Sequence, residues 1–168
     1  MNDAPLPFRL LFANPWLFVA LIMLVNVVLW RRRIAALVRD GRLTAAEASR
    51  LVRALATGFL VPIGLLAVLE QVSGWPSPFC AYAEWRSPVG LAYGAITAAA
   101  WTVALWWTWR AGGAELMAKA SPALTRGGGM RGEYSAAQVR WGVTLLILAA
   151  AVGGTAAAAS IPIADLCR

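Results

Sequence analysis

The sequence contains no histidine and few charged residues. Histidine is the usual axial ligand of haem, the commonest zinc ligand and the default general base near neutral pH, yet none occurs among the 168 residues. Only 14% of the residues are charged, whereas a soluble domain of this length carries roughly a quarter. These two shortages exclude an ordinary histidine-based metal or haem site and argue against a soluble domain.

Cysteine is also scarce, with one residue at position 80 and one at position 167. Two cysteines without histidine cannot build an ordinary zinc or iron–sulfur site. Their wide separation gives no C-x-x-C redox motif, which argues against thiol catalysis. The sequence therefore offers no catalytic residue, no metal site and no cofactor, and we expect none.

Apolar residues make up 60% of the chain, and the mean hydropathy is +0.65. A helix needs about 20 apolar residues to cross the hydrocarbon core of a membrane. Four stretches reach that length: residues 10–30, 54–73, 89–109 and 141–161. The sequence therefore predicts an all-α integral membrane protein, a four-helix bundle that forms one transmembrane domain over residues 1–168.

Prolines and arginines mark the ends of these spans. Pro15 fits the first turn of its helix, Pro62 should kink the second span, and Pro162 should end the fourth. The first span has three arginines after its apolar run and only Arg9 before it. A cleaved signal peptide has the opposite charge order, so we expect an uncleaved anchor.

The basic residues are distributed unevenly between the connecting segments. Residues 31–53 contain seven arginines and residues 110–140 contain five more basic side chains, against three elsewhere. Short cytoplasmic loops carry the excess of positive charge. We expect both loops in the cytoplasm and both termini on the periplasmic or extracellular side, in a bacterial inner (plasma) membrane. The net charge of +7 follows this topology, so no nucleic-acid partner is expected.

Both cytoplasmic segments carry signals for the start of a helix. Asp40 and Gly41 should break residues 31–53 into a short helical hairpin, and Thr44 with Glu47 should form a capping box. Ser135 and Gln138 repeat that pattern before the fourth span. The similar order of features favours a tandem repeat of two-span units, and Gly127–Gly129 is interpreted as a plain linker.

Several residues are candidates for a specific role. The predicted topology places Cys80 and Cys167 on the same oxidising side, which favours a disulfide over two free thiols. Glu70 lies near the outer end of its span, so an interfacial role in contact with water is favoured over proton or ion coupling. Asn26 is expected to donate a helix–helix hydrogen bond rather than to contact a substrate.

Small residues at four-residue spacing let helices approach closely. This pattern predicts that the third and fourth spans pack against each other. The alternative is that copies of the chain associate through it. The residues of the pattern are Gly90, Gly94, Ala98, Gly153 and Ala157. The three arginines after the first span could hold anionic lipid headgroups, although setting the topology is a sufficient role; they are Arg31, Arg32 and Arg33.

These features favour a non-enzymatic accessory, scaffold or assembly subunit that works with another membrane protein or with a second copy of itself in the lipid bilayer. An oligomeric channel or transporter is the alternative, although few polar residues are available to line a pore. An intramembrane enzyme acting on lipid or quinone ranks last, because no nucleophile and base are placed together.

Overall fold

The computed structural model describes residues 15–75, 80–124 and 133–160, and all the regular structure in these ranges is helical. The helices are α2 (Pro15–Arg39), α3 (Ala45–Ser73), α4 (Cys80–Ala83), α5 (Pro88–Trp109), α6 (Gly113–Leu124) and α7 (Ala136–Ser160). Three of them, α3, α5 and α7, are long and apolar enough to cross a membrane. The predicted first span, residues 10–30, extends beyond the described residues at its N-terminal end.

The first two long helices continue past their apolar segments. Helix α2 runs through Arg31 to Arg39, because arginine is a good helix former and ends the apolar run without ending the helix. Helix α3 has 29 residues, which corresponds to about 43 Å at 1.5 Å per residue, against a hydrocarbon core of about 30 Å. The excess lies before Ala54, at the same end of the molecule as Arg39.

The turn between α2 and α3 confirms the predicted hairpin. Gly41 has a φ of 71°, a conformation that glycine adopts without strain, and the Arg42 amide donates to the Leu37 carbonyl at 2.9 Å. Thr44 and Glu47 form the predicted capping box: the Glu47 amide donates to Thr44 Oγ1 at 3.2 Å, and the Thr44 amide donates to Glu47 Oε2 at 2.9 Å. Helix α3 then continues without a break through Pro62.

Helix α7 begins with the second predicted capping box. The Ser135 amide donates to Gln138 Oε1 at 2.8 Å, and the Gln138 amide donates to Ser135 Oγ at 3.2 Å. Each half of the chain thus leads a capped helix into its second apolar segment. However, α6 has no counterpart in the short turn between α2 and α3, so the tandem repeat is not confirmed. Gly127–Gly129 and Pro162 lie outside the described residues.

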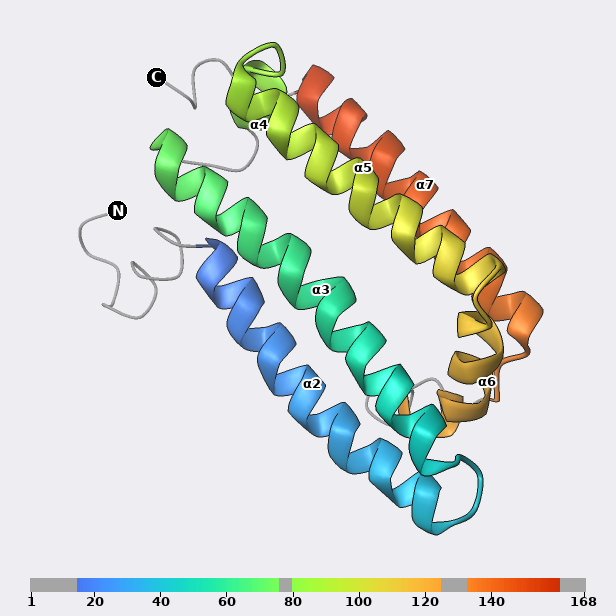
Figure 1. Ribbon diagram of the computed structural model, residues 1–168. Coiled ribbons are helices and arrows are strands. Elements are labelled where there is room, and N and C mark those ends of the chain that lie inside the picture. The colour runs from blue at the N-terminus through green and yellow to red at the C-terminus, as the bar shows by residue number, and fades with distance from the viewer. Residues whose placement is uncertain (1–14, 76–79, 125–132, 161–168) are drawn as a thin grey trace.

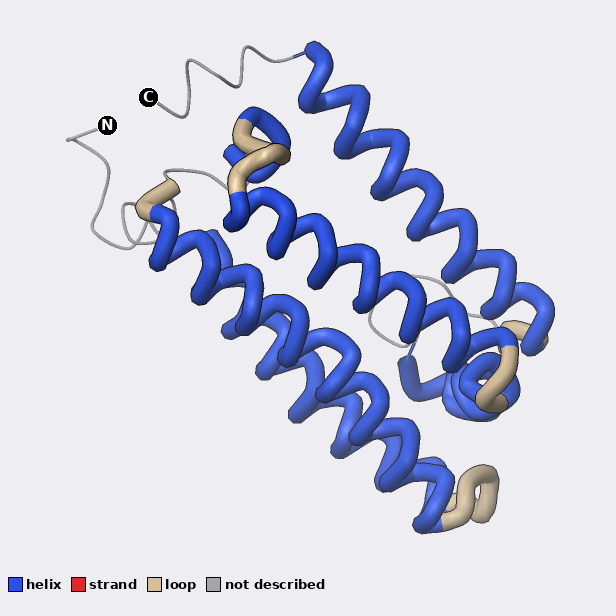
Figure 2. The backbone as a smooth tube through the Cα atoms, turned by 45° about the horizontal axis from the view of Figure 1, so that its top comes forward, coloured by secondary structure: helices blue, strands red, loops and turns tan. Residues whose placement is uncertain are grey.

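The long helices lie side by side in chain order (Figure 1). Packing contacts join α2 to α3, α3 to α5, and α5 to α7, while α6 contacts all four long helices at one end. Figure 2 shows the same arrangement from another angle, with the long helices running roughly along one direction. This arrangement does not confirm a closed four-helix bundle.

The best-packed apolar cluster lies at the basic end of the molecule, outside the apolar segments for the most part. It contains Ile34, Leu37, Leu43, Leu51, Leu55, Leu116 and Ala120. By contrast, large apolar side chains are exposed along the long helices, as at Leu146 (71%) and Val152 (67%). Exposed apolar side chains of this kind suit contact with lipid rather than with water.

Candidate functional site

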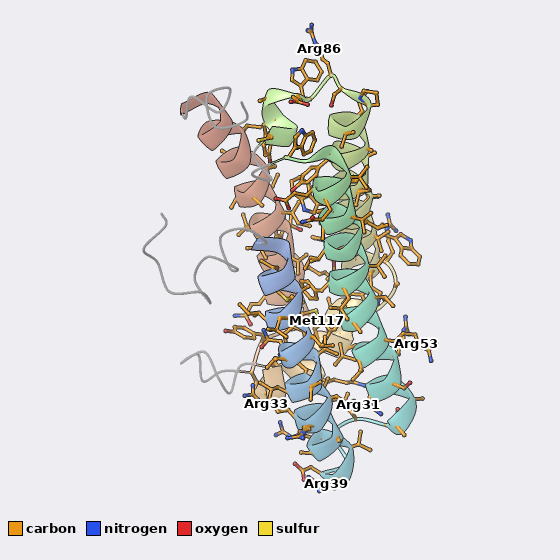
Figure 3. The ribbon with its side chains drawn as sticks, turned by 90° about the vertical axis from the view of Figure 1, so that its left-hand side faces the viewer. Arg31, Arg33, Arg39, Arg53, Arg86 and Met117 are labelled. Atoms are coloured by element: carbon orange, nitrogen blue, oxygen red, sulfur yellow. The ribbon has the colours of Figure 1, made fainter. Side chains whose placement is uncertain are left out.

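The basic end of the molecule forms a small packed unit, which we call the basic head and define as residues 31–55 and 110–124. Ile34 from α2 and Leu51 from α3 are 1% and 0% exposed, and Leu116 and Ala120 from α6 complete the cluster. Figure 3 shows Met117 of α6 close to α2 and α3 in that view, with Arg39 at the far end of the head. The head is therefore a folded part of the protein rather than a pair of connecting loops.

Helix α6 was not predicted from the sequence. Gly112 precedes it with a φ of 72°, and the ring of Trp107 packs so closely on Gly113 that a Cβ would overlap it. The spacing of Leu116 and Ala120 by four residues, with Glu115 and Lys119 on the adjacent face, is the signal that could have revealed this helix.

Ion pairs connect α6 and the start of α7 to the α2–α3 hairpin. Lys119 Nζ lies 2.6 Å from Glu47 Oε1, and Arg42 Nη1 lies 3.1 Å from Glu133 Oε1. Arg140 of α7 pairs with Glu115 of α6. Because all three pairs are at least partly exposed, each contributes little to stability. One pair links α3 to α6 within the head, and the other two link the head to Glu133 and Arg140, just before and inside α7.

Glu47 lies in the first turn of α3, before the apolar part of that helix. The hydrogen bond from Lys119, and then those from the backbone and side chain of Thr44, lower the pKa of its carboxyl to about 2. A lowered folded-state pKa means that the pairing stabilises the fold above the ordinary pKa of 4.5 and is lost as pH falls towards 2. Glu47 is therefore ionised at any physiological pH.

Several arginines of the head have no acidic partner. The carboxylates of Glu47, Glu115 and Glu133 already pair with Lys119, Arg140 and Arg42. Among the described residues, Arg31, Arg32, Arg39, Arg53 and Arg110 are exposed and form no ion pair. Arg33 is half-buried. The head thus carries positive charge that its own acids do not neutralise.

The opposite end of the molecule holds a second polar group, around Glu70 in the last turn of α3. Glu70 is only 5% exposed, so its side chain has little contact with solvent in this structure, and its interfacial role stays a prediction. Trp75 lies against Tyr93, with ring centroids 6.4 Å apart, and its indole N–H donates to Glu84 Oε2 at 3.2 Å. Helix α5, which carries Tyr93, packs along α3.

Asn26 is half-buried in α2. Within the described part of the chain its side chain forms no hydrogen bond, so the expected helix–helix bond is not found there. Neither Asn26 nor the arginines of the head belong to the group around Glu70. Asn26 lies about midway along α2, and the arginines lie at the other end of the molecule.

Helices α5 and α7 do pack together, as predicted, but three of the small residues that were expected at the contact are exposed instead. Gly94, Ala98 and Gly153 are exposed, and a Cβ on either glycine would meet open space. Gly90 is buried against the backbone of Glu84 and Trp85, in the segment between α4 and α5. Ala157 belongs to α7, but its side chain lies outside the described ones.

Larger side chains join α5 to α7 instead. The Trp109 indole N–H donates to Thr144 Oγ1 at 3.1 Å, and the Trp109 ring meets that of Trp141 edge-on, with centroids 5.6 Å apart. Near the other end, the Tyr82 hydroxyl fills the space beside Gly154. A Cβ added at Gly94 or Gly153 would therefore meet no side chain of the described residues within 4 Å.

Cys80 is fully buried at the start of α4, whereas Cys167 lies outside the described residues. The disulfide between them stays a prediction. The full-length protein is denatured in detergent without reductant and treated with a thiol-alkylating reagent. Both cysteines should stay unlabelled, because a disulfide has no thiol to react. Intact-mass measurement reads out the labelling, and Cys167→Ser provides the control with one reactive thiol. Two labelled cysteines in the unreduced protein would rule out the bridge.

Comparison of the chain with protein-family models, with curated proteins and with solved structures found no match.

Proposed function

We propose that the protein is a non-enzymatic accessory, scaffold or assembly subunit of a membrane complex, and that the basic head is the surface through which it meets its partner. The observation that carries this proposal is the packed head itself. Helices α2, α3 and α6 together bury Ile34, Leu51 and Leu116, and the surface that they support is exposed and basic.

The proposal includes a topology. Helix α2 would be a fourth span, because it packs along α3 and is apolar from Val19 to Trp30. The described basic side chains gather at one end of the molecule, apart from Arg86 at the other (Figure 3). The positive-inside bias then supports a cytoplasmic head and two outer termini in a bacterial inner membrane.

Purification of the full-length protein from native membranes tests this function. We expect a larger membrane complex to co-purify at constant stoichiometry, and Arg39→Glu to reduce its recovery at least several-fold, because that residue is exposed on the head without an ion-pair partner. A reversed charge facing a complementary partner costs affinity and slows association. Quantitative mass spectrometry of the eluate is the measurement.

Arg86→Glu is the matched control, since it makes the same charge change at the opposite end (Figure 3). It should leave recovery unchanged. Reproducible isolation of the protein alone, or equal losses with both variants, would count against the head as a partner surface.

An oligomeric channel or transporter is the second candidate, and the exposed small residues favour it. Gly94 and Gly153 leave open space on the outer faces of α5 and α7, where helices of another copy could approach closely. Ion flux into proteoliposomes, compared with Glu70→Gln, tests this alternative. Absence of flux for common ions would leave the partner-based function as the better account.

A further inference from the structure

One face of α3 forms a basic hollow where the helix enters its apolar segment. The hollow has a volume of about 560 Å³ and is lined by Ala46, Ser49, Arg50, Arg53, Ala54 and Thr57. These positions recur every three or four residues, so they lie on one side of the helix. The small side chains of Ala46 and Ala54 lie about one turn before and one turn after Arg50, and none of the lining residues is acidic.

The two arginines differ in how they are held. Arg50 donates a hydrogen bond to the Ala111 carbonyl, in the connection between α5 and α6, which fixes its guanidinium while leaving further N–H donors available. Arg53 is exposed and has no ion-pair partner among the described residues. Thr57 Oγ1 donates to the Arg53 carbonyl at 2.8 Å, so of the hydroxyls only that of Ser49 is available as a donor to a ligand.

The depth of the hollow matches that of phospholipid headgroups. Arg53 directly precedes the apolar segment that begins at Ala54, and Arg50 lies one turn further out. The headgroup layer is about 5–7 Å thick on each side of the hydrocarbon core, equivalent to roughly one helical turn. Two guanidinium groups are thus placed where lipid phosphates lie, and arginine binds phosphate through paired N–H donors.

We infer that this face of α3 binds the phosphate headgroup of an anionic phospholipid, with Arg50 and Arg53 as donors and Ser49 beside them. The acids that could compete for these arginines are engaged elsewhere, because Glu47 pairs with Lys119 and Glu115 pairs with Arg140. The site does not depend on the identity of any protein partner. It lies on the same basic head as the proposed partner surface but uses other arginines than Arg39, so the two proposals are tested with different variants.

Native mass spectrometry of the full-length protein in detergent tests this site, with phosphatidylglycerol, phosphatidylcholine and inorganic phosphate as separate probes. Phosphatidylglycerol should bind more tightly than the other two. Because each basic residue near a membrane surface contributes about fivefold to anionic-lipid affinity, Arg53→Gln should weaken that binding about fivefold and Arg50→Gln/Arg53→Gln about 25-fold. Arg53 has no side-chain partner to lose, so the single variant separates binding from folding.

Arg31→Gln/Arg32→Gln removes the same charge at a similar depth from α2 and is the matched control. It should weaken binding much less than the α3 double variant. Equal losses in the two double variants would show general attraction to a basic surface and overturn the site. No change in Arg53→Gln would overturn it as well. Binding of inorganic phosphate as tight as that of phosphatidylglycerol would reject a lipid as the ligand.

Discussion

Replacing Leu51 with alanine should lower the free energy of unfolding of the head by about 2–5 kcal/mol, the usual cost of removing a fully buried leucine side chain. Leu51 is 0% exposed and belongs to the cluster that joins α2, α3 and α6. Truncation leaves an apolar cavity beside Ile34 and Leu116, which neither water nor lipid can fill favourably. Equilibrium unfolding in mixed detergent, followed by tryptophan fluorescence, measures the loss.

Leu65→Ala is the control, because it removes the same atoms from the same helix at a position that is 48% exposed. Its cost should be clearly smaller than that of Leu51→Ala, since about half of its surface faces the lipid in the proposed topology. Similar losses at both positions would mean that burial in the head contributes no more to stability than contact with lipid.

Replacing Gly90 with alanine should destabilise the opposite end of the molecule by about 1–3 kcal/mol, as overpacking commonly does. The added Cβ would overlap the Glu84 carbonyl oxygen and touch the backbone of Trp85. Neither is the movable end of a side chain. The Glu84 carbonyl also accepts from the Ser87 amide at 2.8 Å, so moving it disrupts the turn that leads into α5. Thermal unfolding in detergent measures the loss.

Gly94→Ala makes the same change one turn further along α5, where a Cβ would meet nothing within 4 Å. Its effect should be neutral or stabilising by up to about 1 kcal/mol, because alanine favours helix over glycine. If Gly94→Ala destabilised the monomer, the result would support the predicted close packing of α5 against α7 at this position. If Gly94→Ala reduced self-association without changing the stability of the monomer, the result would instead support an interface between copies of the chain.

The features predicted best from the sequence depend on neighbouring residues along the chain. Apolar length predicted the segments that become α3, α5 and α7. The side-chain pairs Thr44–Glu47 and Ser135–Gln138 predicted two helix starts, because a capping box is complete within four residues.

The features that were missed depend on contacts between distant segments. Spacing placed Gly90, Gly94 and Ala98 on one face of a helix, but it could not show that the segment after α4 covers the first and leaves the others open. Glu70 was expected to be accessible because it lies near a helix end, but its position within the helix does not reveal the neighbouring segments that leave it only 5% exposed. The head was missed because its apolar residues form only a short run between arginines in α2 and are interspersed with alanines and charged residues in α6.

Hydrogen–deuterium exchange of the full-length protein in lipid nanodiscs, compared between wild type and Leu51→Ala, tests the packed head most directly. Amides of residues 34–39 and 116–120 should be protected in the wild type and exchange at least about 30-fold faster in the variant, since about 2 kcal/mol or more of stability is lost. Amides in the middle of α5 should be unaffected. Rapid exchange of the head in the wild type, or protection that Leu51→Ala leaves unchanged, would contradict the account.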